Sequence, residues 1–91
     1  MAICKRVHYW GTVQGVGFRI TTQRIAGQHA VTGHVRNLPD GQVEVVVAGE
    51  ADEIERFLAA LSARMDSYIK GYKITDASEH PSGFTTFEIR I

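Results

Sequence analysis

The spacing of apolar residues along the chain predicts two amphipathic helices separated by strands. Apolar residues recur every three or four positions in Phe18–His29 and again in a second segment, which Gly49-Glu50 opens and Asp66-Ser67 ends. Elsewhere apolar and polar residues alternate, as in a strand with one buried face. The strands expected on this basis are Ile3–Trp10, Gly33–Leu38, Gln42–Ala48, Tyr68–Thr75 and a short last strand, Phe87–Ile91.

Details within these segments add to the prediction. Leu38-Pro39-Asp40-Gly41 is typical of a hairpin turn, because Pro presets the first turn position and Gly accepts positive φ. In Gln42–Ala48, valines at every second position indicate one buried face. The parity of the apolar residues changes near Gly71, which indicates a β-bulge. Gly27 weakens the first helix by about 1 kcal/mol relative to Ala, which a close contact with the sheet would explain. The expected apolar stripes are Phe18, Thr22, Ile25 and Ala26 in the first helix and Ala51, Ile54, Phe57, Leu58, Leu61 and Met65 in the second.

The order of these elements predicts the fold class. Strand-helix-strand-strand-helix-strand, followed by a short last strand, is a split β-α-β arrangement. Right-handed crossovers would place both helices on one face of an antiparallel sheet. We therefore expect an α+β sandwich that forms a single domain over residues 1–91.

Composition and charge exclude several classes of protein. The chain has no apolar run of membrane-spanning length and no visible secretory signal, and Cys4 is its only cysteine. We therefore expect a cytoplasmic protein without an internal disulfide. Residues 1–39 contain five Lys or Arg and no Asp or Glu, whereas residues 40–91 contain ten acids and five bases, so the two parts carry +5 and −5. A first part without carboxylates favours a small anionic ligand, although chance and solvated surface charges would give the same asymmetry.

A glycine-rich loop between the first strand and the first helix is the main candidate for chemistry. Gly11, Gly15 and Gly17 let backbone N–H groups turn inward, and the helix start adds free N–H donors. Arg19 in the first turn adds a permanent cation. Together these groups predict an anion cradle, although such a loop is more often only a tight connection. The Walker pattern is absent, and Ile20 stands where the dinucleotide pattern needs its third glycine, so we expect a ligand smaller than a nucleotide.

A second candidate lies at the end of the second strand, in Gly33-His34-Val35-Arg36-Asn37. The first helix is expected to run antiparallel to its flanking strands, and on that basis the end of the second strand is difficult to bring to the loop. Periodicity alone therefore favours Asn37 as a turn residue before Pro39-Asp40-Gly41.

These motifs resemble the acylphosphatase family, in its bacterial form. The pattern G-x-V-Q-G-V-x-F-R spans residues 11–19, G-x-V-x-N spans residues 33–37, and the turn Asp40-Gly41 follows. The likeness covers nearly the whole chain, including the turn His80-Pro81-Ser82-Gly83 and the F-x-I-R ending at residues 87–90. The resemblance implies a ferredoxin-like sandwich and hydrolysis of acyl phosphates, the mixed anhydrides of a carboxylic acid and phosphate, without metal or cofactor.

The resemblance also assigns roles to particular residues. Arg19 would bind the phosphoryl group together with backbone N–H groups of the loop, and Asn37 would position the attacking water. The loop residues concerned are Gln14, Gly15, Val16, Gly17 and Phe18. We expect a small acyl phosphate as the substrate, a phosphate or sulfate ion in the site, a monomer, and neither nucleic acid nor membrane as a partner.

Three positions depart from the usual pattern of that family. His34 stands where Trp or Tyr is common, and Arg64-Met65-Asp66 replaces a Gly-Pro pair after the second helix. Ala30 stands where Gly usually ends the first helix, and positive φ there would strain Ala by about 1 kcal/mol.

Two other functions fit a chain of this kind. RNA binding on a ferredoxin-like sheet needs exposed aromatic residues on the central strands, and Gln42–Ala48 has none. The second alternative function is a non-catalytic module that binds an anion. An assay of turnover distinguishes such a module from a hydrolase.

Overall fold

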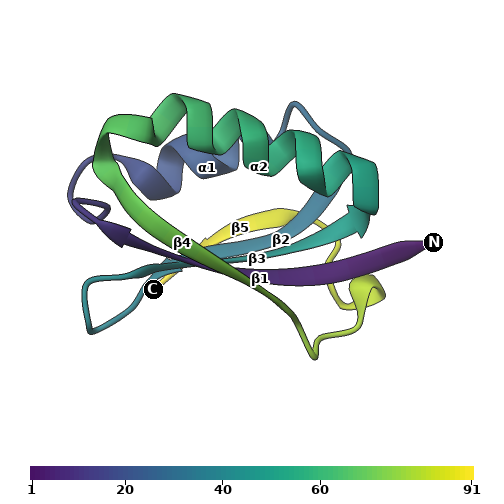
Figure 1. Cartoon of the computed structure of the whole chain (residues 1–91). Helices are drawn as coiled ribbons and strands as arrows, with labels where there is room; N and C mark the ends of the chain where they lie inside the picture. The colour runs from purple at the N-terminus through teal and green to yellow at the C-terminus, as the bar shows by residue number, and fades with distance from the viewer.

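The computed structural model describes all 91 residues and has two helices packed on one face of a five-stranded sheet (Figure 1). The elements in chain order are β1 (Ala2–Gly11), α1 (Phe18–Ala26), β2 (Val31–Asn37), β3 (Val43–Glu50), α2 (Ala51–Met65), β4 (Ile69–Asp76) and β5 (Phe87–Arg90). The strand order in the sheet is β4-β1-β3-β2-β5. Neither helix is both long enough and apolar enough to cross a membrane.

The predicted order of elements and the single helical layer are confirmed, with one correction to the sheet. The strands β4, β1, β3 and β2 are antiparallel to their neighbours, as expected. The last strand differs, because β5 runs parallel to β2. The chain after β4 crosses the sheet on the side away from the helices and reaches the opposite edge, where it enters in the direction of β2 (Figure 1). A short 3-10 turn, Pro81–Gly83, lies in this crossing.

Helix α1 is shorter than predicted, because it ends at Ala26 rather than at His29. The N–H of Gly27 still donates to the carbonyl of Gln23, but the chain then turns toward β2. The expected contact of Gly27 with the sheet is wrong, since a Cβ there would meet only carbonyl oxygens of α1 itself, at 3.4 Å and beyond. The expected strain at Ala30 is also absent, because no residue other than glycine has positive φ.

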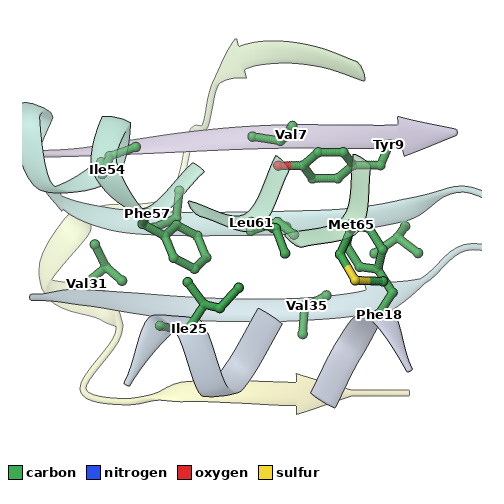
Figure 2. Close-up of a cluster of buried hydrophobic side chains, with 14 of the residues drawn as sticks. Val7, Tyr9, Phe18, Ile25, Val31, Val35, Ile54, Phe57, Leu61 and Met65 are labelled. Atoms are coloured by element: carbon green, nitrogen blue, oxygen red, sulfur yellow. The ribbon is translucent and has the colours of Figure 1, made fainter. Parts of the chain in front are cut away.

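The main core lies between the helices and the sheet. Figure 2 shows side chains from α1 and α2 pointing toward β1 and β2. The predicted stripe of α1 is buried in full, and α2 buries four of its six predicted positions, leaving Leu58 half-buried and Ala51 exposed. Side chains that meet there include Val7, Tyr9, Phe18, Ile25, Val31, Val35, Ile54, Phe57, Leu61 and Met65.

The prediction of a single buried face for β3 is wrong, because both faces of this strand are buried. Val46 and Ala48 point away from the helices and pack with Cys4 of β1 in a second, smaller cluster. Ala77 and Phe84, from the segment between β4 and β5, pack against this cluster. The crossing segment thus covers the face that periodicity leaves open to solvent.

The predicted bulge near Gly71 is confirmed. In the pairing of β1 with β4, Trp10 lies opposite Gly71 and Gly11 lies opposite Ile69, so Lys70 is the extra residue. A Cβ on Gly71 would lie 2.5 Å from the indole ring of Trp10. The close approach of that ring explains why glycine stands at this point of the strand.

The ring of His34 lies on the face of the sheet away from the helices, next to an aromatic ring. Its ring is buried and lies 5.8 Å from the ring of Phe84, measured between centroids. Burial and the nearby Arg90 guanidinium lower the pKa of His34, so the neutral ring is favoured. A neutral imidazole against Phe84 fills the place that a larger aromatic residue commonly has in the family that the motifs resemble.

One carboxylate is buried on the same face of the sheet. Glu44 is 6% exposed, and its oxygens lie 2.8 Å from Nε2 of His8 and 2.9 Å from Nε of Arg36. Nε of Arg6 lies 3.3 Å away. Burial alone would raise the pKa of Glu44, but the hydrogen bonds from His8 and Arg36 outweigh it, so the net effect is a lowered pKa.

We predict that Glu44→Gln lowers the free energy of unfolding by about 1–3 kcal/mol at pH 7, because Arg36 loses its acidic partner and Arg6 keeps only Glu79. The folded pKa of Glu44 is depressed, so the stabilisation is full above the unfolded value of 4.5 and disappears as the pH falls through the folded pKa. Urea unfolding of wild type and variant at pH 7 and pH 3 measures the loss of unfolding free energy and its dependence on pH. Glu88→Gln, which removes an exposed partner of Arg90, is the control and should change little. An equal loss in the two variants at pH 7 would contradict the prediction.

Candidate functional site

A pocket of about 230 Å³ opens where α1 begins and β2 ends. This volume lies below the roughly 300–1,000 Å³ of sites that enclose drug-sized ligands. The residues that line it come from the glycine loop, the first turn of α1, the end of β2 and the last strand. They are Val13, Gly15, Gly17, Phe18, Arg19, Ile20, Asn37 and Ile89.

The loop needs glycine for its backbone conformation. Gly15 has φ 78° and Gly17 has φ 77°, both in the left-handed region that other residues avoid. Gly17 is the N-cap of α1 and has no side chain to satisfy the first N–H groups of the helix, and the first turn holds no acid. The helix therefore presents free donors and the positive end of its dipole at this pocket.

Arg19 is the only charged residue on the wall of the pocket. It is half-buried and forms no ion pair with an acid. An unpaired guanidinium beside free N–H donors gives the pocket a positive potential. The arrangement suits a small anion with several oxygen atoms, such as a phosphoryl group.

Asn37, the last residue of β2, lies on the wall of the same pocket. The expected difficulty of bringing it to the loop does not arise. The chain reverses direction from β1 into α1 and again into β2, so β2 ends on the side of the sheet where α1 begins. Its Oδ1 atom is buried and accepts no hydrogen bond from the protein. A buried amide oxygen without a donor costs about 1–3 kcal/mol, so a ligand or a water that donates to it is favoured.

Gln14 is not among the residues that line the pocket. Its Nε2 atom donates to the carbonyl oxygens of Leu38 and Gln42, each at 2.8 Å. These two residues flank the turn between β2 and β3, so the side chain of Gln14 ties the glycine loop to the hairpin that begins after Asn37. Gln14 and Val16 are the two predicted loop residues that do not line the pocket, whereas Gly15, Gly17, Phe18 and Arg19 do.

Three residues of the pocket were not among the predicted site residues. Val13 is fully buried, whereas Ile20 and Ile89 are 44% and 37% exposed. Ile20 lies off the apolar stripe of α1, and an isoleucine on the polar side of a helix is the signal that could have identified it. Ile89 gives no such signal, because the alternation of the last strand explains it equally well.

The pocket holds few kinds of chemical group. Its wall carries N–H donors, one guanidinium, one carboxamide and apolar side chains, with no carboxylate, imidazole or thiol. No group of three His, Cys, Asp or Glu side chains in the structure is placed to hold a metal ion. The arrangement can bind an anion and orient a polar molecule beside it.

Comparison with known proteins agrees with this geometry. The sequence model of the family described as acylphosphatase matches residues 5–89. An acylphosphatase from Methanospirillum hungatei is 40% identical over 80 residues, which are 88% of this chain and 88% of that protein. An acylphosphatase from Synechococcus sp. is 44% identical over 88 residues, covering 93% of this chain and 92% of that protein. The chain belongs to the acylphosphatase family.

The solved structures of this family also fix the fold class. The crystal structure of an acylphosphatase from Bacillus subtilis superimposes with a TM-score of 0.85 over the full length of both chains, at 27% identity. The predicted ferredoxin-like α+β sandwich is thereby confirmed. The matched residues 5–89 include the glycine loop, Asn37 and Ile89, so the acylphosphatase likeness covers the whole wall of the pocket.

We predict that Gln14→Ala lowers the free energy of unfolding by about 1–3 kcal/mol, because it removes two hydrogen bonds of about 0.5–1.5 kcal/mol each, while the carbonyls of Leu38 and Gln42 keep their backbone donors Gly41 and Leu38. It should also weaken phosphate binding, since the loop is then no longer tied to the hairpin. Urea unfolding and titration with inorganic phosphate measure the two effects. The matched control is Gln28→Ala, an exposed glutamine just after α1 whose side chain makes no hydrogen bond. The same stability in both variants would show that the tie does not hold the loop.

Proposed function

We propose that the protein hydrolyses small acyl phosphates to a carboxylate and inorganic phosphate. Membership of the acylphosphatase family supports this class of reaction. The observation that carries the proposal at the level of residues is the joint position of Arg19, the one charge on the pocket wall, and Asn37, whose buried Oδ1 has no donor.

In the proposed complex, the phosphoryl group lies against the guanidinium of Arg19 and the backbone N–H groups of the loop. Gly15, Gly17 and Phe18 line the pocket, and Gln14 and Val16 lie next to them in the chain. The planar fork of Arg19 can donate two parallel hydrogen bonds to two phosphoryl oxygens. These donors withdraw charge from the phosphorus and stabilise the charge that builds up on the equatorial oxygens in the transition state.

Asn37 supplies the orientation of the water. Its Oδ1 accepts a hydrogen bond from the water, so that the oxygen lone pair points at phosphorus. The water oxygen forms the new P–O bond as the bond between phosphorus and the acyl oxygen breaks, and the carboxylate leaves with the electron pair. The proton released by the water passes to a phosphoryl oxygen, because the wall offers no other base.

The reaction needs little beyond binding and orientation. A carboxylate is a good leaving group, so the chemistry requires no strong nucleophile. Arg19 and the N–H groups supply the positive charge, which is why we propose that the reaction proceeds without metal or cofactor. Every group in the scheme comes from one chain, so we propose that a monomer is the active form.

We expect the purified protein to hydrolyse benzoyl phosphate in buffer containing EDTA, with inorganic phosphate as a competitive inhibitor. A chain that binds phosphate without turnover would instead be a non-catalytic anion-binding module. Loss of activity on chelation would contradict the metal-free scheme.

Arg19→Lys is expected to reduce kcat/KM for benzoyl phosphate on the order of 10²–10³-fold, because an ammonium group keeps the charge but loses the fork. The matched control is Arg24→Lys, an exposed arginine in the last turn of the same helix. Activity of the Arg19 variant equal to that of the control would remove Arg19 from the mechanism.

Asn37→Ala is expected to fold normally and to lose on the order of 10²–10³ in kcat, as for one lost positioning group. Binding of inorganic phosphate should persist, because Arg19 and the loop remain. Circular dichroism and urea unfolding test the fold of this variant alongside the kinetic assay. An unfolded variant would instead support the interpretation of Asn37 as a turn residue.

A further inference from the structure

Two exposed isoleucines from different elements line the pocket. Ile20, in the first turn of α1, is 44% exposed, and Ile89, in β5, is 37% exposed. Both line the pocket that holds Arg19 and Asn37, together with the buried side chains of Val13 and Phe18. One side of the wall is therefore apolar, and it lies next to the only charge.

The packing of α1 against β5 brings the two isoleucines to the same level. Nε2 of Gln23 donates to the carbonyl of Phe87 at 3.2 Å and joins the helix to the strand. Ile20 lies about 4.5 Å back along the helix from Gln23, and Ile89 lies about 6.6 Å forward along the strand from Phe87. Because α1 runs antiparallel to β2 and β5 runs parallel to β2, both steps lead in the same direction, toward the pocket.

Contacts within the protein fix the positions of both isoleucines. Cγ2 of Ile20 lies 3.8 Å from the position that a Cβ on Gly17 would occupy, so its side chain rests over the glycine that starts the helix. Ile89 lies opposite Val35 in the pairing of β5 with β2, two residues before Asn37. Ile20 is thus adjacent in the chain to Arg19, and Ile89 lies on the strand next to the one that ends at Asn37.

We infer that Ile20 and Ile89 contact the acyl group of the substrate and that the protein prefers acyl phosphates with an apolar or aromatic acyl group. The inference rests on the proposed hydrolase function. An aryl or alkyl group that covers these side chains removes apolar surface from water, at roughly 25 cal/mol per Å². The wall has no second cation and no further polar side chain besides Asn37 to recognise a charged or strongly polar acyl group.

The test compares benzoyl phosphate with acetyl phosphate, which share the phosphoryl group but differ in apolar surface. We expect wild type to have the higher kcat/KM for benzoyl phosphate, and the double variant Ile20→Ala, Ile89→Ala to reduce the ratio of the two values about three- to tenfold. A closed pocket discriminates by more than this per methylene, but this wall is open to solvent on one side. The change should come from KM for benzoyl phosphate, since an apolar contact binds ground state and transition state alike.

The matched control is Ile74→Ala, an isoleucine of β4 that is 45% exposed and lies outside this pocket. Its ratio should equal that of wild type, and the inhibition constant of inorganic phosphate in the double variant should stay within about twofold of wild type. An unchanged ratio in the double variant, or an equal fall in the Ile74 variant, would overturn the inference. A rise in the phosphate inhibition constant as large as the rise in KM would also overturn it, because the defect would then lie at the phosphoryl group.

Failure of the proposed function has a different outcome. In that case wild type would hydrolyse neither substrate, and the inference about the acyl group would fall with it. If both substrates are hydrolysed but the ratio of their kcat/KM values is the same in wild type and the double variant, the hydrolase proposal stands. Only the inference that Ile20 and Ile89 contact the acyl group is then wrong.

Discussion

The site depends on the pair of hydrogen bonds that Gln14 donates across the end of the sheet. The glycine loop and the β2–β3 hairpin are separate surface connections, and their relative position would vary if each were attached only to its own strands. Gln14 joins them through the carbonyls of Leu38 and Gln42. Since Arg19 follows the loop and Asn37 precedes the hairpin turn, this tie links the segment that carries the cation to the segment that carries the carboxamide.

The direction of the strands makes such a tie possible. β1 and β2 both pair antiparallel with β3, so they run in the same direction and end on the same side of the sheet. The loop leaves β1 at that side and Asn37 ends β2 there. Any topology in which α1 led to a strand of the opposite direction would separate the two groups by the length of the sheet, whatever their spacing in the sequence.

Ion pairs within the fold explain most of the charge asymmetry of the sequence. Three of the five cations in residues 1–39 pair with acids from the second part of the chain, Lys5 with Asp76, Arg6 with Glu44 and Glu79, and Arg36 with Glu44. These pairs lie between strands and in the crossing segment, and they account for most of the asymmetry without any ligand. Arg19 is unpaired at the pocket, so this one residue and the surrounding N–H groups, rather than the total of five cations, favour an anionic ligand there.

The features that could be predicted from the sequence are those that depend on neighbouring residues in the chain. Helical and strand periodicity are local, and they identified the stripe of α1 and the bulge near Gly71, which the structure confirms. Features that depend on a distant segment were missed or wrong, as with the second buried face of β3, which Ala77 and Phe84 cover, and the parallel pairing of β5. Periodicity alone favours Asn37 as a turn residue, and its role in the site is expected only from the resemblance to acylphosphatases, because the common direction of β1 and β2 is what brings it to the pocket of Arg19. Ile89 reaches the pocket in the same way, from the far end of the chain. A site assembled at the ends of several strands can therefore be read from local sequence only where a continuous segment, here the glycine loop and the start of α1, supplies most of its groups.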